Sequence, residues 1–269
     1  MKIIIIGNGF DLNLGLKTRY KDFVDSDYFT SLIKSKNTLA TYLINKSQLN
    51  NWIDIEKEIT NYSIEVENLN NGETSINVKD DFKALKMALT DYLKEVQEGK
   101  INPNSKAFEM AKNEFETADL IYNFNYTNTV FQVAEILNIE GIKSKHSYVH
   151  GSIENSDIIV GVEDGANIYP KHIFLKKAAD KNFRNINMDN LIDDNDFIVF
   201  GHSMGVTDSS YFKYFIRALT RSRNKSELKF YHYGKIAYDE MMMVINEYSD
   251  NSLTRFRGNN NFIAIDSSE

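Results

Sequence analysis

Four short turns carry the side chains of this sequence that are able to do chemistry, and each follows an apolar stretch typical of a strand. They are Gly7-Asn8-Gly9-Phe10-Asp11, Asn123-Phe124-Asn125-Tyr126-Thr127, His150-Gly151-Ser152 and Gly201-His202-Ser203-Met204-Gly205. In an open parallel sheet the carboxyl ends of the strands share one edge, and ligands bind at that edge. We therefore expect the four turns to gather in one crevice.

The first turn has the glycines that a phosphate-binding loop needs. Gly7 and Gly9 would let the backbone approach a phosphate, and the helix expected after them would present free N–H groups. Position 12 is a leucine, however, where the dinucleotide fingerprint has a third glycine, and no acidic ribose ligand follows at the usual distance. The incomplete fingerprint disfavours a dehydrogenase. The alternative to a phosphate-binding loop is a plain strand–helix turn that binds no ligand.

The turn around Ser203 matches the nucleophile elbow of α/β-hydrolases, including the strand before it. A serine hydrolase also needs an acid and then a histidine downstream. Only His232 follows, with Asp208 and Glu227 as the acids before it. We expect Asp208 to cap the helix that begins near Ser209, which would occupy its carboxylate locally. An esterase that uses Ser203 is therefore the weaker alternative.

Each of the other candidate residues has a structural explanation when it is taken alone. Asn125, with Thr127 and Asn128, would suit a helix cap. His150 would suit the end of a strand with a satisfied imidazole. Only the joint position of Asn125 and His150 indicates a functional pair.

A further motif, Trp52-x-Asp54-x-Glu56, lies where a helix is expected to begin. Acids are favoured in the first turn of a helix, which is the ordinary explanation for both carboxylates. Residues two apart do not share a helix face, so a catalytic carboxylate pair is not expected here.

The elements that must position these residues begin with a buried strand. Ile3 to Ile6 is a continuous β-branched run, typical of a strand covered on both faces in a parallel sheet. The segment up to the next strand, at 120–124, is mostly helical, with helices predicted at 28–45, 52–67, 81–97 and 106–115. We predict one domain over residues 1–269 with a helical insertion within about residues 21–116.

Strands and helices alternate after the insertion. Strands are predicted at 147–150, 158–162, 197–200, 228–233 and 262–265, and helices at 127–137, 209–221 and 236–247. Alternation of this kind predicts an α/β, Rossmann-like fold with a mostly parallel sheet flanked by helices.

The composition sets limits on partners. The 269 residues are 42% hydrophobic and 26% charged, which gives no argument for disorder, and the formal net charge of −7 makes nucleic acid an unexpected partner. One stretch is basic and contains Arg217, Arg221, Arg223 and Lys225. We attribute these cations to the end of a helix, whose dipole they complement.

Cysteine is absent from the sequence, which removes disulfides, thiol catalysis and cysteine-ligated zinc together. No metal is predicted. The sequence opens without a signal-peptide pattern, and no apolar run approaches the roughly 20 residues that a membrane helix needs. We therefore expect a cytoplasmic protein with no membrane contact.

The motifs together resemble the AbiH family of bacteriophage abortive-infection proteins. The resemblance rests, in order and spacing, on Ile3 to Leu12, Trp52-x-Asp54-x-Glu56, Asn123-Phe-Asn125-Tyr-Thr127, His150-Gly151 and Phe200-Gly-His-Ser-Met-Gly205-x-x-Asp208. It implies phage defence in which an infected cell is shut down before phage matures. A phage or host protein as trigger and a homo-oligomeric assembly are compatible with that role.

The same motifs look like a divergent sirtuin-type NAD-binding fold, and this likeness implies roles for the residues. Asn125 would orient the nicotinamide ribose, and His150 would polarise the ribose hydroxyls. The expected cofactor-binding residues are Gly7, Asn8, Gly9, Asp11, Gly151, Gly201, His202, Ser203 and Asp208. Sirtuin deacetylases carry a four-cysteine zinc module that this chain cannot build, so protein deacetylation is not expected.

Hydrolysis of NAD needs only the core of such a site. Cleavage of the nicotinamide–ribose bond passes through an oxocarbenium-like state, as glycoside hydrolysis does. Asn125 would place the ribose or the water, and His150 would act as general base. We expect a defence effector that binds NAD and hydrolyses it, and the alternative from another class is a nucleotide sensor without catalysis.

Overall fold

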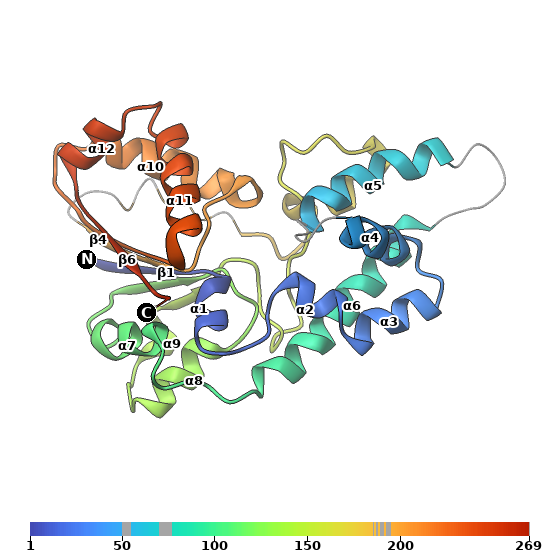
Figure 1. Cartoon of the computed structure of the whole chain (residues 1–269), viewed down its shortest axis with the longest axis horizontal. Helices are drawn as coiled ribbons and strands as arrows, with labels where there is room; N and C mark the ends of the chain where they lie inside the picture. The colour runs from blue at the N-terminus through green and yellow to red at the C-terminus, as the bar shows by residue number, and fades with distance from the viewer. Residues whose placement is uncertain are drawn as a thin grey trace. The chain divides into compact units, whose positions relative to one another are not determined.

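The structure is a computed structural model that describes residues 1–49, 55–69, 77–184, 186, 188, 191 and 195–268. The chain divides into two compact units, and Figure 1 labels the α-helices and several of the strands. Unit 1 comprises Met1–Leu16, Gly99–Ser152 and Arg184–Glu269, and unit 2 comprises Lys17–Glu98 and Ile153–Phe183. The single domain expected over residues 1–269 stays a prediction.

Unit 1 is built on a six-stranded sheet. Its strands are β1 (Lys2–Ile6), β2 (Leu120–Asn123), β3 (His146–Tyr148), β4 (Asp196–Phe200), β5 (Glu227–His232) and β6 (Asn261–Asp266). Their order is β3-β2-β1-β4-β5-β6, and every pairing is parallel. This is the strand order of the Rossmann fold. The predicted fold class is confirmed, including the helical insertion between the first two strands.

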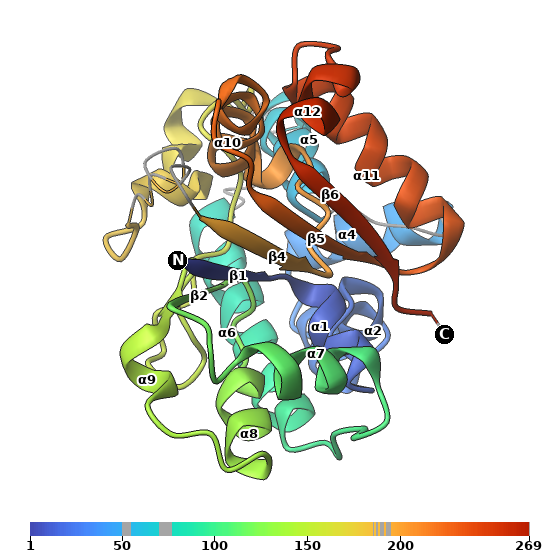
Figure 2. The same ribbon diagram turned by 90° about the vertical axis from the view of Figure 1, so that its left-hand side faces the viewer.

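β1 is the centre of the sheet because its side chains are apolar on both faces. Figure 2 shows β1 between β2 and β4, and Ile3 to Ile6 are all fully buried. Ile3 and Ile5 pack into a cluster with side chains of α10, α11 and α12. Ile4 and Ile6 pack into the opposite cluster, with side chains of α1, α7, α8 and α9. Burial of each isoleucine contributes roughly 1.5–3 kcal/mol to stability.

The helices that cover the sheet follow the predicted alternation. They are α1 (Asn8–Asn13), α7 (Lys106–Glu114), α8 (Thr129–Ile136), α9 (Ile142–Lys145), α10 (Ser209–Arg221), α11 (Gly234–Tyr248) and α12 (Leu253–Asn259). α10 carries the clearest apolar stripe, with Tyr211, Phe212, Phe215, Ile216 and Leu219 buried on one face. That apolar stripe faces the sheet, so the opposite face of α10 points away from the sheet.

In its described residues, unit 2 combines α-helices from residues 17–98 with a second segment of the chain. The helices are α2 (Tyr20–Val24), α3 (Asp27–Lys34), α4 (Thr38–Leu49), α5 (Ile55–Leu69) and α6 (Val78–Gln97), and the second segment carries the 3-10 helices η1 (Pro170–Leu175) and η2 (Lys177–Ala179). Buried polar contacts join the two parts. Lys177 Nζ lies 3.1 Å from Glu56 Oε1, and Tyr169 N donates to Ser63 Oγ over 2.9 Å.

Two predicted elements differ from the structure. The strand predicted at 158–162 is wrong, because this segment belongs to unit 2 and forms only an isolated bridge between Val162 and Lys176. Its apolar residues are buried without strand pairing, which sequence periodicity cannot separate from a buried strand. The helix predicted at 28–45 is interrupted, because Lys36 has a φ of 61° and Asn37 accepts a hydrogen bond from Ala40 N to begin α4.

The turns after β1 and β4 meet backbone to backbone. Gly9 N donates to Gly201 O over 2.9 Å, and a Cβ on Gly201 would lie 2.4 Å from Gly9 Cα. A Cβ on Gly7 would likewise lie 2.6 Å from His202 Cα. Gly201 also has a φ of +64°, which strongly favours glycine. This contact accounts for all three glycines without any ligand.

We expect Gly201→Ala to destabilise the protein by about 2–5 kcal/mol, because it combines left-handed strain with backbone overlap. Gly258→Ala is the matched control. Gly258 lies in α12, and a Cβ there would have nothing within 4 Å, so the helix should gain up to about 1 kcal/mol. Urea unfolding of both variants measures the difference. A Gly201→Ala protein within 1 kcal/mol of the parent would contradict this account of the contact.

Candidate functional site

The loop after β2 is held in place by an asparagine at the strand end. Asn123 is fully buried, and its Oδ1 accepts from Asn125 N over 2.9 Å while its Nδ2 donates to Thr127 O over 3.4 Å. Tyr148 Oη donates to the same Thr127 oxygen over 3.2 Å. Asn125 is only 6% exposed, and its Nδ2 donates to Gly7 O over 3.1 Å. Asn125 therefore connects the turn after β2 to the turn after β1.

A buried carboxylate in α1 fastens the same loop. Asp11 is 1% exposed, and its two oxygens accept from Thr127 Oγ1 over 2.5 Å and from Thr129 Oγ1 over 2.6 Å. Burial raises the pKa of Asp11 to about 6, and hydrogen bonds from the threonines and Asn125 oppose that rise. Asp11 thus acts in the structure as a positioning residue for the loop after β2.

A carboxylate lies between two histidines. Asp208, at the end of the 3-10 helix η4 (Val206–Asp208), has Oδ1 2.8 Å from His150 Nε2 and Oδ2 3.4 Å from His202 Nε2. All three side chains are largely buried. His150 follows β3, and the other two residues follow β4, so the cluster gathers residues from two strand ends.

The hydrogen bonds determine which ring nitrogens carry protons. Met204 N donates to His202 Nδ1 over 2.9 Å, so the neutral His202 ring carries its proton on Nε2, facing Asp208. An ionised Asp208 only accepts, so His150 Nε2 also carries a proton toward it. In neutral His150 the lone pair is then on Nδ1. This is the arrangement in which a carboxylate orients an imidazole base.

The predicted capping role of Asp208 is wrong. Asp208 does occupy the N-cap position of α10, but its side chain makes no cap hydrogen bond there. The reason is that its oxygens face the two imidazoles instead. Asn128 likewise stands at the N-cap of α8 without a side-chain cap hydrogen bond.

Aromatic rings form one wall of the histidine cluster. The Phe124 ring lies edge-on to both histidines, with centroids 4.4 Å from His202 and 5.5 Å from His150. Tyr211 and Phe212 of α10 pack against the same phenylalanine. An apolar wall lowers the local dielectric and strengthens the attraction between the carboxylate and the rings. Sequence reasoning missed these aromatics, although Phe124 stands between the two asparagines of its motif.

The structure brings the predicted residues together in two groups. His150, His202 and Asp208 contact one another directly, and Asn125 contacts Gly7. Phe124, the neighbour of Asn125, links the groups through its ring contacts.

The remaining predicted residues lie around these groups. Gly151 follows His150 with a φ of 72°, and Asn8 and Ser203 are exposed. Trp52 and Asp54 are outside the described residues. Glu56 lies in unit 2 and pairs with Lys177.

Ser203 does not form the pair that a serine hydrolase needs. Its Oγ accepts from Gly205 N over 3.4 Å, while His232 Nδ1 hydrogen-bonds to Gly234 O over 3.0 Å. The left-handed residues of this turn are Gly201 and Met204 and do not include Ser203. The nucleophile-elbow geometry that the weaker esterase alternative would require is therefore not formed at Ser203.

Unit 2 has a polar cluster that sequence reasoning missed. His172 Nδ1 lies 2.9 Å from Ser63 Oγ, and its Nε2 lies 3.3 Å from Glu67 Oε1. The order serine, histidine, acid is that of a catalytic triad, but Ser63 is 0% exposed and also accepts from Tyr169 N. The cluster fastens the η1 segment to α5. No local motif in the sequence indicated it.

Comparison with known proteins gives one family. The family model described as "Bacteriophage abortive infection AbiH" matches residues 3–232. No curated protein and no solved structure matches the chain. In the described ranges, no helix has the length and apolar character to cross a membrane.

We expect Asp11 to make stability depend on pH. Because its folded pKa of about 6 lies above the ordinary 3.8, the folded state binds this proton more tightly than the unfolded state does. The resulting stabilisation is full below the ordinary pKa and is lost as pH rises through about 6. Between pH 7.5 and 5 the parent should gain about 1.4 kcal/mol relative to Asp11→Asn.

Urea unfolding at the two pH values measures that difference. Asp91→Asn, an exchange of an exposed aspartate, is the matched control and should leave the parent's pH dependence unchanged. If the parent and Asp11→Asn proteins respond identically to pH, the buried carboxyl at Asp11 does not titrate in this range.

Proposed function

This chain belongs to the bacteriophage abortive infection AbiH family, and we propose that it serves abortive infection by binding NAD in unit 1 and hydrolysing the nicotinamide–ribose bond. Family membership supplies the role in abortive infection, and the nucleotide chemistry is our proposal. The observation that carries it is the Asp208 carboxylate between His150 and His202 at the strand ends.

The position of the cluster supports a nucleotide ligand. Asn125 follows β2, His150 follows β3, and His202 and Asp208 follow β4, all in a sheet with parallel strands in the Rossmann order. In such sheets dinucleotides bind outside the carboxyl ends of the strands, where the strand order reverses about the first strand. The turn after β1 lies at that point.

The chemistry of His150 supports hydrolysis. With Nε2 hydrogen-bonded to Asp208, its Nδ1 accepts a proton from water, and the Asp208 carboxylate stabilises the imidazolium that forms. The water oxygen forms a bond to ribose C1′ as the C1′–N bond breaks. The electron pair of that bond goes to the pyridinium nitrogen, so neutral nicotinamide leaves and ADP-ribose remains. NAD is the substrate here and is not a resident cofactor.

Asn125 supports the same step through its fixed position. Its side-chain Nδ2 donates to Gly7 O, and its backbone N–H donates to Asn123 Oδ1. A side chain with so little freedom orients a ribose hydroxyl or a water at small entropic cost.

A nucleotide sensor without catalysis is the second candidate function. The observation that favours it is burial, because His150 is 4% exposed and Asn125 is 6% exposed. Side chains so enclosed would need local opening to reach a substrate. Calorimetric binding of NAD with no release of nicotinamide would establish the sensor and overturn hydrolysis.

We expect His150→Gln and Asn125→Ala each to lower nicotinamide release from NAD by roughly 10²- to 10⁴-fold, the range that a general base or positioned group supplies. His202→Gln is the matched control, since its ring contacts the same carboxylate and phenylalanine but its Nδ1 already accepts from Met204 N. His202→Gln should lower nicotinamide release far less. Chromatography of nicotinamide, with circular dichroism to verify folding, makes the measurement.

Ser203→Ala separates this reaction from the esterase alternative. Loss of a nucleophile abolishes activity, whereas loss of a serine near the ligand lowers it only modestly. Full activity in His150→Gln together with silence in Ser203→Ala would overturn the proposed roles.

A further inference from the structure

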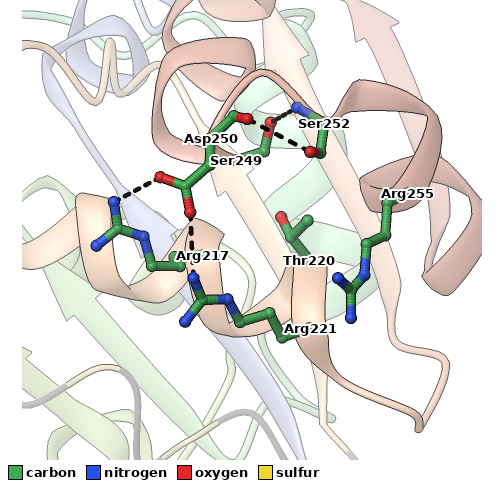
Figure 3. Close-up of a pocket in the computed structure, with 7 residues that line it drawn as sticks. All are labelled: Arg217, Thr220, Arg221, Ser249, Asp250, Ser252 and Arg255. Carbon is green, nitrogen blue, oxygen red and sulfur yellow. Dashed lines mark hydrogen bonds and ion pairs between the residues drawn. The ribbon is translucent and has the colours of Figure 1, made fainter.

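Three arginines of unit 1 surround a small depression away from the histidine cluster. Arg217 and Arg221 lie in the last turns of α10, and Arg255 lies in α12. Figure 3 shows Arg217 and Arg221 reaching the carboxylate of Asp250, with Arg255 on the far side of Thr220. α10 begins beside Asp208 and ends before β5, so this end of the helix is at the opposite edge of the sheet from the histidines.

Asp250 shows that the two α10 guanidiniums accommodate one oxyanion between them. Arg217 Nη2 lies 2.7 Å from Asp250 Oδ1, and Arg221 Nη2 lies 3.2 Å from Asp250 Oδ2. The carboxylate is presented by a tight turn in which Asp250 and Asn251 both have left-handed φ angles, 55° and 59°. Both side chains tolerate this conformation better than most residues do.

Neither the dipole of α10 nor pairing with Asp250 explains why Arg255 lies at this depression. Among the ion pairs and hydrogen bonds of the described residues, Arg255 has no partner, and it belongs to a different helix from the other two arginines. Arg223 and Lys225 follow α10 directly and are exposed. A helix C-terminus accounts for cations on its own last turn, as we expected from the sequence, but not for this third helix-borne guanidinium.

Charge is distributed unevenly along the chain. Residues 209–226 and 251–265 contain seven of the 31 cations and none of the 38 acids, although the whole chain has a net charge of −7. The two segments pack together, since Asn259 Nδ2 donates to Thr220 O and Asn260 Nδ2 donates to Leu219 O. Asp250 directly precedes the second segment and is an acid among these cations. Cations outnumber acids in this part of unit 1, although the net charge of the whole chain disfavours nucleic acid.

An exposed aromatic side chain accompanies the cations. Tyr214 is 56% exposed and precedes Arg217 by three residues and Arg221 by seven, which places the three on one face of α10. Basic side chains interleaved with an exposed ring suit single-stranded nucleic acid, because the cations follow the phosphates and a base stacks on the ring.

We propose that Arg217, Arg221 and Arg255 bind the phosphate backbone of single-stranded nucleic acid without sequence preference, with Tyr214 stacking on a base. A guanidinium fork matches phosphate and carboxylate alike. A backbone phosphate thus takes the place that the Asp250 carboxylate occupies between Arg217 and Arg221. The turn carrying Asp250 acts as an internal competitor that weakens binding.

Fluorescence anisotropy with a labelled, mixed-sequence single-stranded oligonucleotide tests the arginines. Arg221→Gln with Arg255→Gln should weaken binding by about tenfold or more and reduce the slope of log affinity against log salt by about 1.4, which is about 0.7 for each lost contact. The matched control is Lys112→Gln with Lys143→Gln, two exposed lysines of α7 and α9. An equal loss in both double variants would overturn the site.

Asp250→Asn tests the competitor, and asparagine keeps the left-handed turn. It should tighten oligonucleotide binding several-fold. Glu247→Gln makes the same change in charge three residues earlier, at an exposed position, and should change affinity less than about twofold. Equal tightening in both would show a general charge effect and overturn the proposal.

Two further arms identify the ligand. Tyr214→Ala should weaken single-strand binding by roughly 1–3 kcal/mol, about 5- to 150-fold, while leaving the salt slope unchanged. Calorimetric binding of inorganic pyrophosphate to a protein that binds no oligonucleotide would indicate a small-anion site and overturn the assignment to nucleic acid.

Discussion

Gly9 and Gly201 meet backbone to backbone at the edge of the sheet, and the placement of the candidate site follows from that contact. With the turn after β4 held against the turn after β1, His202 begins where a Cβ on Gly7 would collide with it. Met204, which has a left-handed φ, lies two residues further along this turn. Asp208 follows and contacts His150, which comes after β3. A carboxylate enclosed by two imidazoles and an aromatic wall thus depends on two residues that have no side chain.

Much of unit 1 could be predicted from local patterns, because its strands are short apolar runs bounded by polar turns. Ile3 to Ile6 predicts a doubly covered strand, and the covered strand lies at the sheet centre. The pattern fails where burial occurs without pairing. The apolar residues at 158–160 are buried within unit 2, and no local signal distinguishes that environment from a sheet. The break at Lys36 and Asn37 depends on the left-handed φ of Lys36 and on the Asn37 cap of α4. The helical periodicity is the same on both sides of the break, so it does not indicate where one helix ends and the next begins.

The candidate site was predictable in place but not in its contacts. Strand ends of a parallel sheet share an edge, which was enough to expect Asn125, His150 and the Gly201 turn near one another. The partnership of Asp208 was not predictable, because its sequence position indicated a helix cap while its histidines come from another strand end and from the preceding turn. Asp11 shows the same limit, since its burial follows from packing of α1 against the loop after β2.

The position of β1 has a consequence for synthesis of the chain. β1 is synthesised before the other strands of the sheet, and its two neighbours, β2 and β4, begin only at Leu120 and Asp196. Roughly 110 residues separate β1 from β2. At ordinary elongation rates, translation of that segment takes on the order of 10 s. During that interval four consecutive isoleucines have no strand to pair with, which is the kind of segment that aggregates or recruits chaperones. The helices α2 to α6 of unit 2 are made in that same interval, and η1 and η2 are made before β4, so the strand at the centre of the sheet completes its pairing only after all of these helices have been synthesised.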